Sequence, residues 1–294
     1  MEHQTPTPIT GHTALICLLG SPCAHSISPM MHNASFEALG LDYRYLAFDV
    51  NETTLPTAVA GLKVLGARGF NLTMPDKNLM VSLCDDLSTA ARIIGAVNTV
   101  VNENGRLIGH NTDGIGYMQS VKDAGYDIIG KKMTLLGAGG AATAILVQAA
   151  LDGLKEISVF VRPTSRFYDR LVHTVDELTK ITDCKIKICD FSDAELLKQE
   201  LADSAILING TSVGMAPHED TCPVPEDLVF PDGLIVSDII YNPRETRLLS
   251  MAKHQGNPFF NGSYMLLYQG AEAFRLWTGK EMPVEQIKRE FFSR

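Results

Sequence analysis

The chain has 294 residues, 45% of them hydrophobic, and a formal net charge of −9 at pH 7. This length and apolar content can fill two domain cores. The acidic balance, without any basic run, argues against a general nucleic-acid surface, and no apolar run reaches the roughly eighteen residues of a membrane-spanning helix. We therefore expect a soluble globular protein with a small-molecule partner and no nucleic-acid or membrane partner.

The N-terminal residues and the cysteines both indicate a reducing compartment. Residues 1–12 are polar and rich in Thr and Pro, so we predict a disordered leader and not a secretory signal, and hence a cytoplasmic location. Reduced thiols are expected because the six cysteines contain no C-x-x-C pair; they are Cys17, Cys23, Cys84, Cys184, Cys189 and Cys222. The spacing of Cys23, His25 and His32 matches no zinc pattern, and no metal site is predicted.

Apolar runs alternate with helix-compatible segments in residues 13–110. The expected strands are Ala14–Leu19, Tyr43–Val50 and Gly69–Leu72, and the expected helices are Met30–Leu39 and Leu55–Leu65. This alternation is typical of a mainly parallel sheet covered by helices. We therefore predict an N-terminal α/β substrate domain.

The same rhythm repeats in residues 111–245, which we predict to be a Rossmann-like, doubly wound dinucleotide-binding domain. Its expected strands are Met133–Leu136, Ile157–Val161, Ile186–Cys189, Ala205–Asn209 and Leu234–Ser237, and its helices Ala141–Leu151, Tyr168–Thr182 and Asp193–Leu201. Residues 246–294 are expected to add two helices, Ser263–Thr278 and Val284–Phe292, without a sheet of their own, and to return to the first domain. Residues 105–116, with four glycines, resemble a crossing between domains, and a cleft there would suit a small ligand.

The strongest single motif is Gly137-Ala138-Gly139-Gly140-Ala141-Ala142, which fits G-x-G-x-x-A between an expected strand and an expected helix. Gly137 permits the tight turn, Gly139 lets the backbone approach a pyrophosphate, and Ala142 allows close helix packing. The phosphates would lie at the helix N-terminus. The alternative is a glycine-rich turn without a ligand.

Cofactor choice is normally decided after the next strand, where this chain has Val161-Arg162-Pro163-Thr164-Ser165-Arg166. An acidic residue there would bond the ribose 2′-hydroxyl of NAD, whereas two arginines and two hydroxyls suit a 2′-phosphate. The segment slightly favours NADP over NAD. The alternative is that Arg162 and Arg166 are only solvated surface residues.

An amide, a hydroxyl and an amine occur together in Gly69-Phe70-Asn71-Leu72-Thr73-Met74-Pro75-Asp76-Lys77. This segment predicts a strand end and a helix that starts near Pro75 and runs to Leu83. Lys77 is then either a solvated surface lysine or a functional cation near a helix N-terminus, where cations are disfavoured. With Asp113 it could handle the proton that accompanies hydride transfer, either as an acid/base or as a cation that stabilises an alkoxide.

Two serines follow the first expected strand. Ser26 and Ser28 are two residues apart, so their hydroxyls face the same way in an extended segment and could bind a small carboxylate. The alternative is that Ser28 caps a helix before Pro29.

Taken together, the ordered motifs resemble those of the shikimate dehydrogenase family, including its quinate/shikimate dehydrogenase branch. The resemblance extends from about Ala14 to Lys288. It is carried by Ser26-Ile27-Ser28-Pro29, Asn71-Leu72-Thr73-Met74-Pro75-Asp76-Lys77, Gly95-Ala96-Val97-Asn98-Thr99, Asn111-Thr112-Asp113-Gly114, the Gly137 loop, Asn209-Gly210-Thr211-Ser212-Val213-Gly214-Met215, Tyr241-Asn242-Pro243 and Gln269-Gly270-Ala271.

The resemblance implies reversible, NAD(P)-dependent reduction of 3-dehydroshikimate to shikimate in the chorismate pathway of aromatic amino-acid biosynthesis. Quinate is a further candidate substrate, and a homodimer is the candidate assembly. Lys77 and Asp113 would be the catalytic pair. The implied substrate contacts are Ser26 and Ser28 for the carboxylate, Thr73, Asn98 and Gln269 for ring hydroxyls, and Tyr45 from the quinate/shikimate branch. The implied cofactor site contains Gly137, Ala138, Gly139, Gly140, Ala141, Arg162, Thr211, Ile239, Tyr241 and Gly262.

The chain departs from the family pattern at the cofactor site. Val161-Arg162-Pro163 stands where the family often has Asn-Arg-Thr, and Thr164 lies where the quinate/shikimate branch often has an acid. Tyr264 adds bulk to a segment that commonly reads Gly-x-Gly-Met-Leu. NADP and NAD therefore both stay open.

Two other functions are compatible with the sequence. One is a sensor that binds a cyclohexene carboxylate and a dinucleotide without turnover, and the presence of both Lys77 and Asp113 argues against it. The other is a related dehydrogenase for another small acid or an amino analogue. Thr73, which by resemblance contacts a substrate hydroxyl, argues against the amino analogue.

Overall fold

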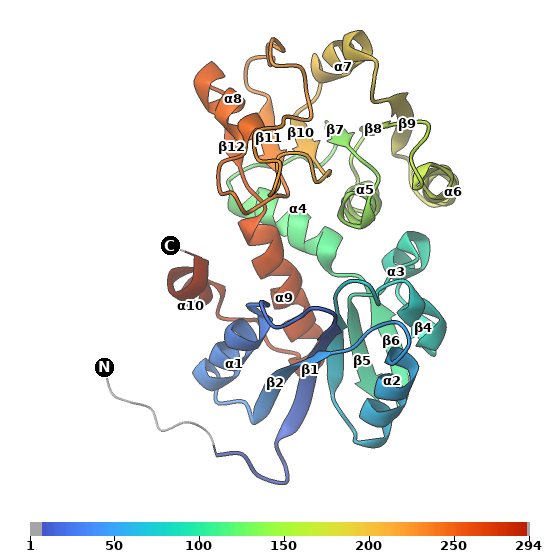
Figure 1. Cartoon of the computed structure of the whole chain (residues 1–294), viewed down its shortest axis with the longest axis vertical. Coiled ribbons are helices and arrows are strands. Elements are labelled where there is room, and N and C mark those ends of the chain that lie inside the picture. Colours follow the sequence, from blue (N-terminus) through green and yellow to red (C-terminus); the bar gives the residue numbers. More distant parts are fainter. Residues whose placement is uncertain (1–7, 293–294) are drawn as a thin grey trace. The chain divides into compact units, whose positions relative to one another are not determined.

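The computed structural model describes residues 8–292 and divides the chain into two compact units. Unit 1 contains the residues up to Thr112 together with those from Gln269 onward, and unit 2 is Asp113–Tyr268 (Figure 1). Within residues 8–292, no helix is long and apolar enough to cross a bilayer. All six cysteines are unpaired, as predicted.

Unit 1 is built on a six-stranded sheet with the strand order β2-β1-β3-β5-β6-β4. The strands are β1 (Ala14–Gly20), β2 (Tyr43–Asp49), β3 (Gly69–Leu72), β4 (Asp86–Leu87), β5 (Thr99–Glu103) and β6 (Arg106–His110). Only β5 runs antiparallel to its neighbours. The helices are α1 (Ser28–Ala38), α2 (Leu55–Val64), a 3-10 helix (Leu79–Leu83), α3 (Thr89–Ile94), the second part of α9 (Ser263–Thr278), α10 (Val284–Ile287) and a π-helical turn (Lys288–Phe292).

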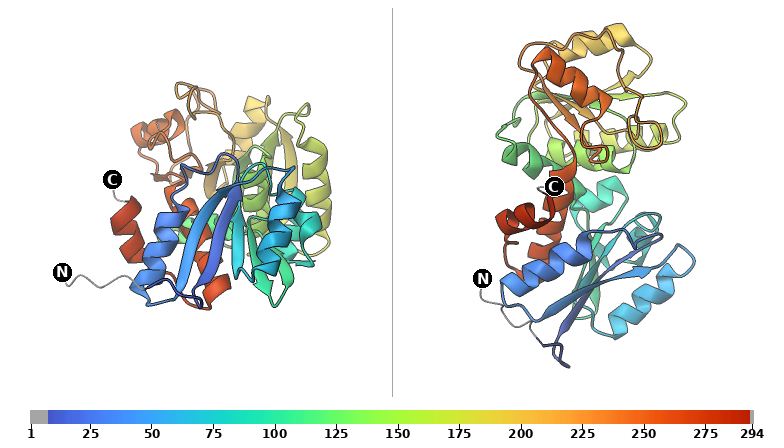
Figure 2. Two further views of the ribbon diagram at one scale, coloured as in Figure 1. Left: turned by 60° about the horizontal axis from the view of Figure 1, so that its bottom comes forward. Right: turned by 60° about the vertical axis from the view of Figure 1, so that its left-hand side comes forward.

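The two faces of this sheet are covered differently. Leu55, Val59 and Leu62 of α2 pack against apolar side chains of the sheet on one face, while α1 covers the other (Figure 2). Alternate side chains along a strand point to opposite faces, so one sheet serves two cores. At the second core Trp277 of α9 donates its indole N–H to the Val100 carbonyl at 2.9 Å. A side chain at Gly69 would collide with this indole, which explains the glycine there.

Unit 2 contains a second six-stranded sheet, entirely parallel, with the order β12-β11-β10-β7-β8-β9. Its strands are β7 (Lys132–Leu136), β8 (Glu156–Val161), β9 (Lys185–Asp190), β10 (Ile206–Asn209), β11 (Ile235–Asp238) and β12 (Phe259–Phe260). Its helices are α4 (Asp113–Asp123), α5 (Gly140–Leu151), α6 (Tyr168–Thr179), α7 (Ala194–Leu201), α8 (Arg247–Gln255) and the first turns of α9. This is the predicted doubly wound arrangement.

The segment expected to be a crossing is a hairpin followed by a helix. Asn104 and Gly105 join β5 to β6, and both have positive φ angles, 54° and 92°. Two such residues form the tight hairpin turn for which an Asn-Gly pair is the strongest short-range signal. Asp113 is the first residue of α4. The division between the two units falls between Thr112 and Asp113, inside the segment 105–116 that was expected to be the crossing.

The C-terminal segment is divided between the units, which differs from the predicted boundary at residue 245. β12 pairs with β11, and Leu248, Leu249 and Ala252 of α8 belong to the core of unit 2. The expectation of helices without a sheet was therefore wrong for 246–268, because a two-residue strand gives no sequence periodicity. Of the predicted leader, residues 1–7 lie outside the described residues, and residues 8–12 are exposed.

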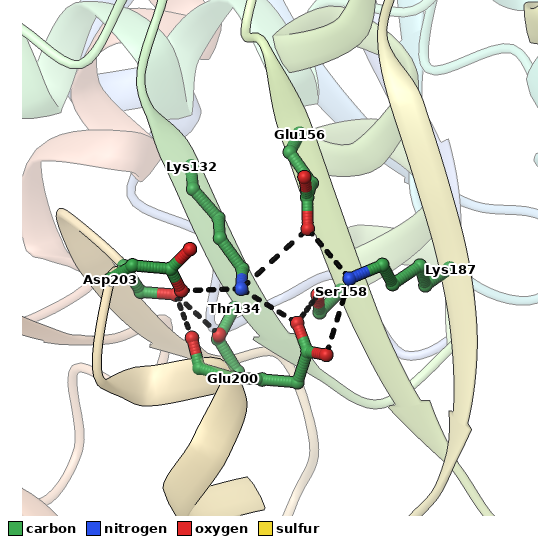
Figure 3. Close-up of polar contacts among 8 residues, drawn as sticks. Lys132, Thr134, Glu156, Ser158, Lys187, Glu200 and Asp203 are labelled. Atoms are coloured by element: carbon green, nitrogen blue, oxygen red, sulfur yellow. Dashed lines mark hydrogen bonds and ion pairs between the residues drawn. The ribbon is translucent and has the colours of Figure 1, made fainter. Parts of the chain in front are cut away.

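An ion-pair network lies at the amino ends of the unit 2 strands (Figure 3). The ammonium group of Lys132, nearly buried, contacts Glu200 at 2.7 Å and Asp203 at 2.5 Å. Glu200 also accepts the Ser158 hydroxyl at 2.6 Å, and Lys187 contacts both Glu200 and Glu156. Burial alone would raise the pKa of Glu200, but the bonds from Lys132 and Ser158 outweigh it and lower the pKa to about 2.

We predict that Glu200→Gln lowers the free energy of unfolding at pH 7 by about 3 kcal/mol, because it leaves the Lys132 charge poorly compensated. A carboxylate with a lowered folded-state pKa stabilises the protein above its unfolded pKa. The difference from wild type should therefore shrink as the pH falls from 4.5 toward about 2. Urea unfolding at several pH values measures it. Glu195→Gln is the control: its exposed pair with Lys198 on the same helix should contribute little to the free energy of unfolding.

Candidate active site

The predicted substrate residues of unit 1 gather at one edge of its sheet because of strand direction. Ser26 and Ser28 follow the end of β1, and Thr73 and Lys77 follow the end of β3. β5 is antiparallel to β3, so Asn98, which precedes β5, lies at the edge where β3 ends. The Leu72 N–H accordingly donates to the Asn98 carbonyl at 2.9 Å.

Ser28 does not cap the helix that it begins. It is the first residue of α1, and the cap position is Ile27, whose side chain makes no capping hydrogen bond. The Ser26 hydroxyl accepts the Ser28 N–H at 3.2 Å. The structure therefore does not support capping, the alternative function considered for Ser28.

Tyr45 is completely buried, with its ring stacked on His32 at a centroid distance of 4.6 Å. Its hydroxyl donates to Asn71 Oδ1 at 2.7 Å, and the side-chain amide of Asn33 bonds both its backbone N–H and its carbonyl. Burial raises the pKa of Tyr45 well above its usual value and lowers that of His32 to about 3, so both side chains are neutral. Tyr45 is thus a buried support for Asn71 in this structure.

A fully bonded set of buried amides and hydroxyls continues from Tyr45 toward Asn98. The Asn71 amide donates to the Asn98 carbonyl and to Thr99 Oγ1, each at 3.0 Å. Asn98 Oδ1 accepts the Thr112 N–H at 2.8 Å and the Thr99 hydroxyl at 3.0 Å. Such a network fixes the orientation of the Asn98 side chain.

Lys77 lies on a turn that follows Thr73 and not near a helix start, contrary to the prediction. Residues 74–78 are turns, and the 3-10 helix begins only at Leu79. The turn is held by neighbouring backbone: the Ser21 N–H donates to the Met74 carbonyl at 3.1 Å, and the Val97 N–H donates to the Lys77 carbonyl at 2.8 Å. Tertiary hydrogen bonds therefore replace those of the predicted helix, and Lys77 is half-buried.

Gln269 and Asp113 lie on helices. Gln269 is in α9, where the following Gly270 allows Met31 of α1 to approach closely. Asp113 occupies the first turn of α4, where a negative charge is favoured by the helix dipole. Both side chains are half-buried.

In unit 2 the glycine-rich turn has the shape that a pyrophosphate requires. Gly137 has φ +97°, and a side chain there would lie 2.8 Å from Thr211 Cγ2. Added side chains at Gly139 and Gly140 would meet no atom within 4 Å, so open space lies over the turn. α5 begins at Gly140 without a side-chain cap, which leaves its first N–H groups for an anion. These residues fit a dinucleotide cofactor.

The other predicted cofactor residues follow the carboxyl ends of neighbouring strands. Arg162 follows β8, Thr211 follows β10, Ile239 and Tyr241 follow β11, and Gly262 follows β12. Arg162 and Tyr241 are exposed, whereas Thr211 and Ile239 are half-buried. A side chain at Gly262 would collide with the Ile239 carbonyl, so only glycine permits this close approach.

Asp238, the last residue of β11, was not among the residues predicted from the sequence. It is completely buried and accepts hydrogen bonds from Asn209, Ile240 and Thr246. An acidic residue directly after three apolar or small strand residues, at the edge that carries the glycine turn, was the available signal.

A parallel sheet with a glycine-rich first turn and open helix N-terminus defines unit 2 as a dinucleotide-binding unit. Comparison with known proteins specifies the class further. Residues 18–100 match the shikimate dehydrogenase substrate binding domain, and residues 262–290 match the shikimate 5'-dehydrogenase C-terminal domain. The chain is 52% identical to shikimate dehydrogenase (NADP(+)) of Listeria monocytogenes serotype 4b, over 99% of this chain and 100% of that protein.

Two solved structures are also similar to this chain. Shikimate 5-dehydrogenase from Listeria monocytogenes, in complex with shikimate and NAD, has a TM-score of 0.93 and 52% identity over 96% of this chain and 98% of that one. Ligand-free 5-ketofructose reductase of a Gluconobacter strain has a TM-score of 0.84 and 32% identity over 95% and 98%. The chain belongs to the shikimate dehydrogenase family.

Asp76, beside Lys77, is a buried acid without compensation. It is completely buried, and neither carboxylate oxygen has a hydrogen-bond partner within residues 8–292. Burial raises the pKa of Asp76, and the nearby charge of Glu52 raises it further. An acid whose folded-state pKa is raised destabilises the fold at any pH above that value.

We predict that Asp76→Asn raises the free energy of unfolding at pH 7 by about 1 kcal/mol, since it removes an unpaired buried charge. The gain should vanish below pH 3.8, where the acid is protonated in both states, should grow as the pH rises from 3.8 to the raised folded-state pKa, and should stay constant above it. Denaturant unfolding across this range measures it. Asp85→Asn is the contrast: its carboxylate accepts the Leu107 N–H at 2.7 Å and pairs with Lys63, so its loss should destabilise.

Proposed function

We propose that this protein is a shikimate dehydrogenase that catalyses the reversible, NAD(P)-dependent reduction of 3-dehydroshikimate to shikimate. The observation that carries the proposal is the placement of the substrate residues Ser26, Ser28, Thr73, Lys77 and Asn98 at one edge of the unit 1 sheet. Membership of the shikimate dehydrogenase family and the glycine-rich turn of unit 2 support the same reaction.

In this proposal the two ends of the substrate are bound by different chemical groups. The hydroxyls of Ser26 and Ser28 bind the carboxylate. Thr73, Asn98 and Gln269 bind the ring hydroxyls and orient the ring. Asn98 is suited to this because its neighbours already satisfy Oδ1 and fix its side chain. Tyr45 acts by holding Asn71 in place.

Lys77 and Asp113 handle the proton of the reacting hydroxyl. Removal of that proton during shikimate oxidation leaves negative charge on oxygen, which a lysine ammonium stabilises and a proton acceptor relieves. The nicotinamide cofactor supplies hydride transfer when it is bound. The Gly137–Ala141 turn holds its pyrophosphate, and Thr211, Ile239, Tyr241 and Gly262 border the same edge of the sheet.

We propose NADP as the preferred cofactor, with NAD as an alternative. Arg162 and Arg166 are exposed at the end of β8, where a 2′-phosphate would lie. The Listeria relative is named as an NADP(+) enzyme, although the similar Listeria structure contains NAD. We also propose that the protein is cytoplasmic and forms a homodimer. Light scattering of the purified protein measures its oligomeric state.

A reductase for another polyol is the second candidate, because the similar Gluconobacter structure is a 5-ketofructose reductase. That relative shares 32% identity, against 52% for the Listeria shikimate dehydrogenase. A sensor without turnover has no supporting observation in the structure.

The purified protein should reduce NADP, and more weakly NAD, when given shikimate. Initial rates at 340 nm for shikimate and quinate with each cofactor, and for 5-ketofructose with each reduced cofactor, provide the test. Activity only with 5-ketofructose would identify the second candidate, and no activity with any pair would leave a sensor as the explanation.

Lys77→Ala should reduce kcat for shikimate by about 100-fold or more, with a much smaller effect on the dissociation constant of shikimate, because its charge acts on the developing alkoxide. Stopped-flow turnover and calorimetric binding measure the two quantities. Lys63→Ala, which removes an exposed ion pair with Asp85, is the control and should leave both unchanged. Equal losses of turnover and affinity would make Lys77 a binding residue only.

A further inference from the structure

Asp238 is a carboxylate buried among neutral groups. It is completely buried at the end of β11. Oδ1 accepts the Ile240 N–H at 3.0 Å and the Asn209 amide at 3.1 Å, and Oδ2 accepts the Thr246 hydroxyl at 2.7 Å and the Asn209 amide at 3.2 Å. No lysine or arginine is among these partners. A buried anion of this kind costs stability, so its presence calls for a functional explanation.

The N–H donors at Oδ1 favour the ionised form. Backbone and amide N–H groups can only donate, and they point at both carboxylate oxygens. A proton on Oδ1 would face the Ile240 N–H, and an Asn side chain in place of Asp238 would bring an N–H group against one of these donors. Burial raises the pKa of Asp238, and the bonds from Ile240, Thr246 and Asn209 act against that rise.

Through Asn209 the carboxylate holds the loop that follows β10. With its amide bonded to Asp238, Asn209 also donates to the Val213 carbonyl at 3.1 Å. Its Oδ1 accepts the Thr211 N–H at 3.0 Å and the Thr211 hydroxyl at 2.7 Å. Apart from its bond to Asp238, every bond of the Asn209 side chain therefore fixes residues 209–213.

Asp238 also holds the loop that follows β11. The bond to the Ile240 N–H fixes residues 239–241 directly. Thr246, the N-cap of α8, donates to the carboxylate and accepts the Leu249 N–H. Asp238 thereby connects two loops and the start of a helix.

Loop 209–213 borders the glycine-rich turn, and loop 239–241 borders the start of α9. The methyl group of Thr211 lies against Gly137, and the Ile239 carbonyl lies against Gly262. The loop after β8, where the adenosine half of the cofactor would lie, is separated from β10 and β11 by β7 in the strand order. In a doubly wound fold the two halves of a dinucleotide lie on either side of the first strand.

We propose that Asp238, as a carboxylate ion, is a positioning residue that holds loops 209–213 and 239–241 in the arrangement that receives the nicotinamide half of the cofactor. The inference rests on the proposed function. It concerns loop geometry, and Asp238 itself touches no reactant.

Asp238→Asn tests this by comparing whole cofactors with fragments that lack nicotinamide. Calorimetric titrations use NADP with 2′-phospho-ADP-ribose, and NAD with ADP-ribose. The variant should bind the whole cofactor about tenfold more weakly and the fragment within about twofold of wild type. Ser237→Ala, a buried neighbour on the same strand, is the matched control and should bind both as wild type does.

Steady-state kinetics separate positioning from a merely structural role. Positioning raises the KM for the cofactor and leaves the KM for shikimate unchanged, whereas partial unfolding lowers kcat and leaves both KM values unchanged. If Asp238→Asn does not fold, Thr246→Val replaces it, with Thr246→Ser expected to restore cofactor binding.

Three results would overturn the inference. They are unchanged cofactor affinity in a folded variant, an equal loss for whole cofactor and fragment, and a loss of kcat alone. A wild-type protein that binds the fragments and cofactors but turns over neither shikimate nor quinate overturns the proposed substrate and leaves the inference standing. A wild type that binds no cofactor overturns both.

Discussion

Strand direction is the constraint on which the candidate site depends. Parallel strands end at one edge of a sheet, so the loops that follow them meet there whatever their separation in sequence. In unit 2 this brings together the turns after β7, β8, β10, β11 and β12. In unit 1 the same rule applies, with one addition: because β5 is antiparallel, it contributes its start, and therefore Asn98, to the edge where β1 and β3 end.

Buried polar groups at these edges differ in their hydrogen bonds and in whether a charge is compensated. This difference decides whether we expect a group to reduce stability or to position its neighbours. Asn71, Asn98 and Asn209 use their amides in networks that orient neighbouring residues. Asp238 accepts hydrogen bonds, but no lysine or arginine is among its donors. The Asp76 carboxylate has no hydrogen-bond partner within residues 8–292. An unsatisfied charge costs more than a bonded one, which is why Asp76 is expected to reduce stability while Asp238 is expected to organise loops.

Much of the fold could be predicted because its strands are apolar and regularly spaced. Ala14–Leu19 and Met133–Leu136 were located to within a residue of β1 and β7. The helix near Pro75 was wrong because hydrogen bonds from Ser21 and Val97, distant in sequence, hold a turn there. The hairpin at Asn104 and Gly105 was predictable from its turn residues but was missed. β12 was not predictable, since two residues form a strand only where β11 offers an edge.

The sequence by itself determined the fold class, the glycine-rich turn and the set of candidate residues, because local spacing and motif order carry that information. The tertiary structure decided what those residues contact. It buried Tyr45 against Asn71, placed Lys77 on a turn, and put a carboxylate at the junction of two loops. Such contacts join residues that are far apart in the chain, and only the pairing of strands brings them within bonding distance.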